Sequence, residues 1–102
     1  MSEVAVRNRT TSKQVIKTDE PKKFNVIFMN DNATSMDFVV ELLEVKFGYD
    51  SERSYGIMME IHEQGRAIVA TYHFEIAEQK ALECIYLARQ NGFPLEVLVK
   101  PE

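Results

Sequence analysis

Asn30, Asp31 and Asn32 form a short polar run in which one carboxylate is flanked by two amides. Such side chains compete with the backbone for hydrogen bonds, so a plain turn is the simplest interpretation of the run alone. A second polar group, His62, lies four residues after Met58 and shares its face of a helix. A carboxylate, an amide oxygen and an imidazole beside apolar side chains would suit an alkylammonium ion attached to a hydrophobic group.

The same residues admit a hydrolytic interpretation, because Thr34 with His62 and Asp31 can be drawn as a nucleophile, a base and an orienting acid. Thr34 already has a sufficient role in the predicted secondary structure. It precedes an apolar helical pattern and has Asp37 three residues later, which is the arrangement of a weak capping box. We therefore expect binding without catalysis and keep the hydrolase as an alternative.

Metal and cofactor sites are not predicted. The soft ligands His62, His73 and Cys84 have no spacing typical of zinc motifs, and the four glycines form no phosphate-binding loop. Cys84 is the only cysteine, so it cannot form an internal disulfide. Its apolar neighbours at helical spacing predict a buried thiol and a reducing, cytoplasmic location.

Charge is divided unevenly along the chain. Residues 1–23 carry six Lys/Arg and three Asp/Glu, whereas residues 24–102 carry six and thirteen. The acidic part would repel phosphate backbones and favour cationic groups on peptides, so we expect no nucleic-acid partner. No apolar run is long enough to cross a membrane, and we expect no membrane partner.

The elements that must position the candidate site follow from periodicity and from turn residues. Met36, Val39, Leu43 and Phe47 have the spacing of a buried helix face, and Gly48 follows as a left-handed stop. Two further helices and three strands are predicted in the same way. The predicted elements, in order, are strand 24–29, helix 35–47, helix 51–65, strand 66–72, helix 74–90 and strand 95–100.

This order predicts an α+β fold, β-α-α-β-α-β, in which a three-stranded antiparallel sheet packs against three helices. Residues 24–102 form one domain in this prediction. Met1 to Lys23 has scattered charges and few apolar residues, so we expect a disordered, flexible N-terminal arm.

At these residues the chain resembles the bacterial ClpS family, the adaptors of the Clp protease that recognise N-terminal degrons. The similarity covers roughly Lys22 to Glu102, and its several motifs occur in the family's order and at its intervals. The runs that carry it are Val26–Asp31, Thr34–Val39, Met58–Gly65, Glu75–Lys80 and Pro94–Leu95.

The resemblance implies a non-enzymatic adaptor that binds proteins beginning with Leu, Phe, Tyr or Trp and passes them to the ClpA unfoldase of ClpAP. It implies that Asn30, Asp31 and His62, with Asn32 beside them, hold the free α-amino group. It also implies a degron side-chain pocket in which Met36 excludes β-branched residues, and a surface that meets the ClpA N-terminal domain. The implied pocket residues are Thr34, Met36, Val39, Met58, Ile61 and Leu95, and the implied unfoldase contacts are Glu75, Glu78 and Lys80.

Three positions depart from the family pattern. Asn32 stands where a second Asp is frequent, so one negative charge near the ammonium is missing. Ser35 replaces a common Pro, and His73 replaces a usual capping Thr, so both helix starts are expected to be less firmly fixed. An interaction domain similar to the C-terminal domain of the ribosomal stalk protein, without an amine pocket, is the alternative.

Overall fold

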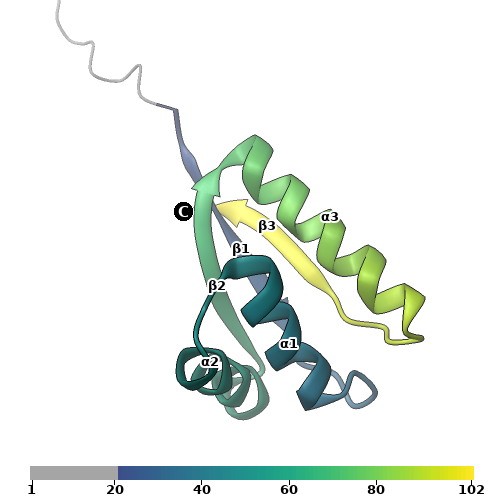
Figure 1. The fold of residues 1–102 in the computed structure, drawn as a ribbon. Helices are drawn as coiled ribbons and strands as arrows, with labels where there is room; N and C mark the ends of the chain where they lie inside the picture. Colours follow the sequence, from purple (N-terminus) through teal and green to yellow (C-terminus); the bar gives the residue numbers. More distant parts are fainter. Residues whose placement is uncertain (1–20) are drawn as a thin grey trace, which may run out of the picture.

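The computed structural model describes residues 21–102 and confirms the predicted fold class. The predicted N-terminal arm lies outside the described residues except for Pro21–Lys23, and Lys23 already belongs to the first strand. The elements are β1 (Lys23–Met29), α1 (Met36–Phe47), α2 (Ser51–Gln64), β2 (Arg66–His73), α3 (Phe74–Gln90) and β3 (Val97–Pro101) (Figure 1).

The central strand of the sheet is β1, which pairs antiparallel with β2 on one side and β3 on the other. Val26 and Phe28 are fully buried and point to the same face, as the two-residue period of a strand requires. A register shift between Val26 and Ile27 marks an irregularity in the pairing with β2. The last strand starts later than predicted, at Val97, so Leu95 lies in the loop that precedes it.

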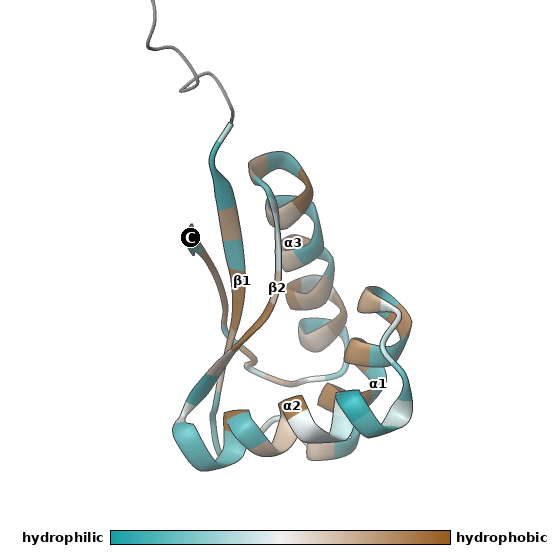
Figure 2. Ribbon diagram, turned by 90° about the vertical axis from the view of Figure 1, so that its left-hand side faces the viewer, coloured by the Kyte–Doolittle hydropathy of each residue, from teal (hydrophilic) through white to brown (hydrophobic). Residues whose placement is uncertain are grey.

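One face of the sheet is covered by α3, while α1 and α2 lie at one end of the strands (Figure 2). Within residues 21–102 no helix covers the opposite face. The small side chains of α3 allow this close approach to the sheet. They are Ala77, Ala81, Cys84 and Ala88, all of which are buried. Cys84 is fully buried, so the predicted buried core thiol is confirmed, and this burial raises its pKa to about 12.

The N-cap of α1 differs from the prediction. Ser35, rather than Thr34, caps the helix, because its hydroxyl accepts a hydrogen bond of 3.1 Å from the Phe38 N–H. The replacement of a common Pro therefore supplies a capping group. The start of α3 agrees with the expectation, since His73 occupies the N-cap position without a side-chain hydrogen bond.

Candidate functional site

The polar turn after β1 is held against the end of α2 and the start of β3. The Asn30 N–H donates a hydrogen bond of 2.9 Å to the carbonyl of Gly65, the left-handed residue that ends α2. The Met29 N–H donates one of 3.0 Å to the carbonyl of Glu96. These two bonds bring three chain segments, far apart in the sequence, to one corner of the sheet.

Asp31 organises the turn itself. Its Oδ1 accepts hydrogen bonds from the N–H groups of Ala33 (2.8 Å) and Thr34 (2.6 Å), and its Oδ2 accepts one of 2.8 Å from the Thr34 hydroxyl. A carboxylate has about four lone-pair positions, so about one remains for a ligand. The Thr34 hydroxyl that was predicted to cap α1 is used here, which explains why the cap passes to Ser35.

The charge of Asp31 is stabilised by this arrangement. Partial burial raises the pKa of its carboxyl group. The hydrogen bonds from Thr34 and Ala33, together with the charge of Arg89, lower the pKa by a larger amount. The net result is a pKa below the ordinary value of 3.8. Asp31 is therefore a carboxylate at neutral pH, suited to a cationic group.

A narrow pocket opens beside this turn. The empty volume of the pocket is ≈ 280 Å³, which includes open space at its mouth. The centre of a water molecule could occupy only ≈ 20 Å³ of the pocket, so the pocket is narrow. The residues that line it come from β1, the turn, α1, α2 and the loop before β3. They are Met29, Asn30, Asp31, Thr34, Met36, Val39, Met58, Ile61, His62 and Leu95.

Most apolar walls of the pocket are part of the protein core. Val39, Met58, Ile61 and Leu95 are all buried, Leu95 to 1% exposure. Met36, at the first position of α1, is 43% exposed. Four walls are thus fixed by core packing, whereas Met36 is a flexible side chain at the mouth and Met29 is half-buried.

Of the ten residues proposed from the sequence for degron binding, nine therefore line one pocket, and one does not. Asn32 is exposed and does not line it. Met29 is a pocket residue that the sequence analysis did not select. Strand alternation supplies a signal for it, since Met29 follows buried Phe28 and must point away from the face that Phe28 occupies.

The residues implied to contact an unfoldase lie elsewhere, on α3. Glu75 and Glu78 are exposed. The half-buried Lys80 is engaged within the domain, because its Nζ donates a hydrogen bond of 2.7 Å to the carbonyl of Lys46 and lies 5.8 Å from the ring centre of Phe47. Lys80 therefore joins α3 to the last turn of α1.

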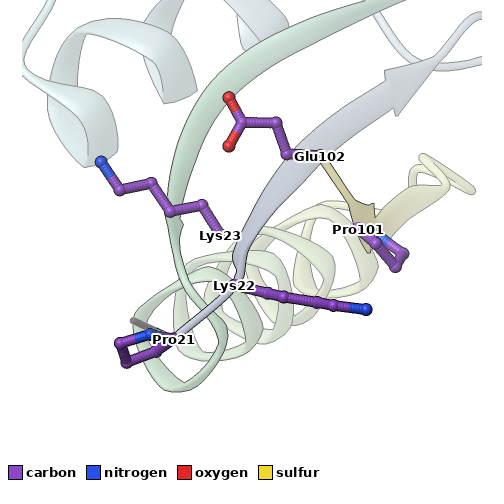
Figure 3. Close-up of a pocket in the computed structure, with 5 residues that line it drawn as sticks. All are labelled: Pro21, Lys22, Lys23, Pro101 and Glu102. Carbon is purple, nitrogen blue, oxygen red and sulfur yellow. The ribbon is translucent and has the colours of Figure 1, made fainter. Parts of the chain in front are cut away.

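A second hollow lies at the far end of the sheet, where the Glu102 N–H donates a hydrogen bond of 3.0 Å to the Lys23 carbonyl. Pro21, Lys22 and Pro101 complete its lining, and the two lysine side chains extend in different directions (Figure 3). It contains none of the predicted site residues. Within residues 21–102, no helix has the length and apolar character needed to cross a membrane.

A family model described as ATP-dependent Clp protease adaptor protein ClpS matches residues 19–98. The chain belongs to the ClpS family. A ClpS adapter from Desulforapulum autotrophicum is 38% identical over 102 residues, which cover 100% of this chain and 98% of that relative. One from Pectobacterium carotovorum is 40% identical over 88 residues, which cover 86% of this chain and 83% of the relative.

A solved ClpS structure has the same fold. Agrobacterium tumefaciens ClpS2, bound to L-phenylalaninamide, aligns with a TM-score of 0.80 and 35% sequence identity. The alignment covers 81% of this chain and 100% of that chain. The protein is thus a ClpS-type adaptor of the Clp protease, with nine of its ten predicted degron-binding residues around one pocket.

Proposed function

We propose that this adaptor is non-enzymatic, binds N-degrons and delivers the proteins that carry them to the ClpA unfoldase of ClpAP. The degron is a free α-amino group followed by a bulky hydrophobic first residue, Leu, Phe, Tyr or Trp. The observation that carries the proposal is that one pocket has both the polar groups of Asn30, Asp31 and His62 and apolar walls. A soluble adaptor of this kind acts in the bacterial cytoplasm, which a single reduced cysteine suits.

The ligand of the A. tumefaciens relative supports the same chemistry. L-phenylalaninamide has a free α-amino group and a benzyl side chain, and its amide takes the place of the following peptide bond. In this chain the ammonium would be held by Asp31, with Asn30 and His62 as further hydrogen-bonding groups. The benzyl group would enter between Met36 and the buried walls.

Selectivity results from the need for both features at once. Charge-assisted hydrogen bonds to the ammonium contribute about 1.5–3 kcal/mol each. Burial of a Leu or Phe side chain contributes roughly 1.5–3 kcal/mol more. Neither contribution alone exceeds the cost of association by much, so only a ligand with both binds well.

The experiment that tests this function compares peptides that differ only in the first residue. We expect a peptide beginning with Phe or Leu to bind about 10- to 100-fold tighter than one beginning with Ser, because the buried side chain supplies the difference. Fluorescence anisotropy with labelled peptides measures it. Equal affinities for Phe and Ser peptides would refute the proposed pocket.

Delivery is proposed to use the α3 surface that contains Glu75, Glu78 and Lys80. Substitution of exposed Glu75 by Ala is expected to weaken binding to the ClpA N-terminal domain several-fold while leaving peptide affinity unchanged, since Glu75 does not line the pocket. Glu96→Ala, also an exposed acid, is the control. Calorimetric titration measures both, and equal unfoldase binding by all three proteins would remove Glu75 from the interface.

Two alternatives make different predictions. A hydrolase would need the Thr34 hydroxyl to face a base, but this hydroxyl donates to Asp31, whose low pKa makes it a poor base. Turnover of an activated ester that is lost in His62→Ala would support the hydrolase. A domain similar to the ribosomal stalk protein would bind no amine, so the peptide titration separates it from an adaptor.

A further inference from the structure

The loop of residues 91–96, between α3 and β3, contributes Leu95 to the pocket. Leu95 is buried although it lies outside any helix or strand. Backbone hydrogen bonds hold the loop near its two ends. The Phe93 N–H donates to the Ala88 carbonyl (2.8 Å), and the Glu96 carbonyl accepts from Met29 (3.0 Å).

Arg89, on the last turn of α3, holds the part between these ends. Its Nη1 donates hydrogen bonds of 3.0 Å to the Phe93 carbonyl and 2.9 Å to the Leu95 carbonyl. One guanidinium nitrogen thus joins two carbonyls on either side of Pro94. The Phe93 ring also packs on Phe38 of α1, with ring centres 5.0 Å apart.

We propose that Arg89 is a positioning residue for degron selection: by fixing the 91–96 loop, it holds Leu95 as a rigid wall of the pocket. The inference rests on the proposed function. Arg89 does not line the pocket, so its proposed role is indirect. If the loop is already ordered before the ligand binds, none of the binding free energy is lost in ordering it. Arg89 contacts the loop and acts on the ligand only through Leu95.

The charge of Arg89 is a weaker explanation for such a role. The guanidinium does lower the pKa of Asp31, but its influence is the smallest, after burial and the hydrogen bonds from Thr34 and Ala33. The two loop hydrogen bonds are direct, at 2.9 and 3.0 Å. Arg89→Lys keeps the positive charge without the planar guanidinium, so it separates the two explanations.

The test is a double-mutant cycle on binding of a Phe-start peptide. Arg89→Ala is expected to weaken binding about tenfold, the equivalent of one such hydrogen bond. In a Leu95→Ala background the same change should weaken it less than about twofold, because the wall that Arg89 fixes is absent. Arg66→Ala is the matched control, since exposed Arg66 lies outside the pocket lining. Arg89→Lys should resemble Arg89→Ala.

Hydrogen exchange tests the positioning role without any ligand. In Arg89→Ala the Phe93 amide should exchange about tenfold faster than in the wild type, while amides of β1 remain unchanged. This measurement needs only Arg89→Ala, so it stands even if Leu95→Ala does not fold.

Three results with Arg89→Ala would overturn the inference: unchanged peptide binding, equal losses of binding in the wild-type and Leu95→Ala backgrounds, or unchanged exchange of the Phe93 amide. Binding retained in Arg89→Lys with lost binding in Arg89→Ala would assign the role to charge and also overturn it. If the wild type binds no Phe peptide, the proposed function fails. The exchange result then still decides whether Arg89 positions the loop.

Discussion

A peptide beginning with a free Phe is expected to bind at least about 100-fold tighter than its Nα-acetylated copy. Acetylation removes the positive charge and replaces an ammonium donor with a bulky amide beside Asp31. Because Asp31 already accepts three hydrogen bonds, about one lone-pair position remains, and it is suited to a small cation. Loss of a charge-assisted bond, together with desolvation of the remaining acceptor position of Asp31, accounts for roughly 3 kcal/mol.

Asp31→Asn tests the same interaction from the protein side. The variant should lose most of its preference for the free peptide over the acetylated one, measured by anisotropy at pH 7. Asp37→Asn, in the first turn of α1 but outside the pocket lining, is the matched control and should keep it. Equal affinity of the wild type for the two peptides would contradict the amine-binding role of the rim.

The pH dependence of binding follows from the two groups in contact. The lowered pKa of Asp31 keeps its carboxylate ionised at neutral pH, whereas an α-amino group loses its proton above about pH 8. Affinity should therefore fall as the pH rises through the pKa of the peptide amine.

Met36→Ala is expected to raise the affinity for peptides beginning with Ile or Val at least about tenfold. Met36 is the one exposed apolar wall, so a Cβ branch on the ligand would meet it at the mouth of a narrow pocket. Truncation removes that obstacle but also some contact area, so affinity for Phe should fall by only a few-fold.

Met59→Ala is the control for this change, because Met59 lies on α2 beside Met58 but does not line the pocket. The selectivity of Met59→Ala should equal that of the wild type in the anisotropy assay. If Met36→Ala discriminates against Ile and Val as strongly as the wild type does, Met36 is not the selective wall.

The order and approximate bounds of all six elements could be predicted from the sequence, because hydrophobic periodicity and glycine stops are local signals. The boundaries that moved did so for tertiary reasons. Thr34 and Ser35 are both good N-caps, and the choice between them depends on Asp31, which takes the Thr34 hydroxyl. The start of β3 depends on pairing with β1.

The site was predicted in composition but not in geometry. Helical spacing places Met58 and His62 on one face, but it does not predict the Asn30–Gly65 hydrogen bond that holds the end of α2 at the polar turn. Strand alternation gives the side on which Met29 lies, but it does not distinguish Met29 from the other apolar strand residues. Arg89 donates to carbonyl groups, which no side-chain pattern shows.

The most direct test of the account is an amide NMR titration of the full chain with L-phenylalaninamide and with N-acetyl-L-phenylalaninamide. We expect the free amine to shift resonances of the residues around the pocket, chiefly Asn30, Asp31, His62 and Leu95, and the acetylated compound to shift none of them at the same concentration. Shifts of equal size with both compounds, or shifts confined to other parts of the domain, would contradict a pocket that binds the amine and the side chain together.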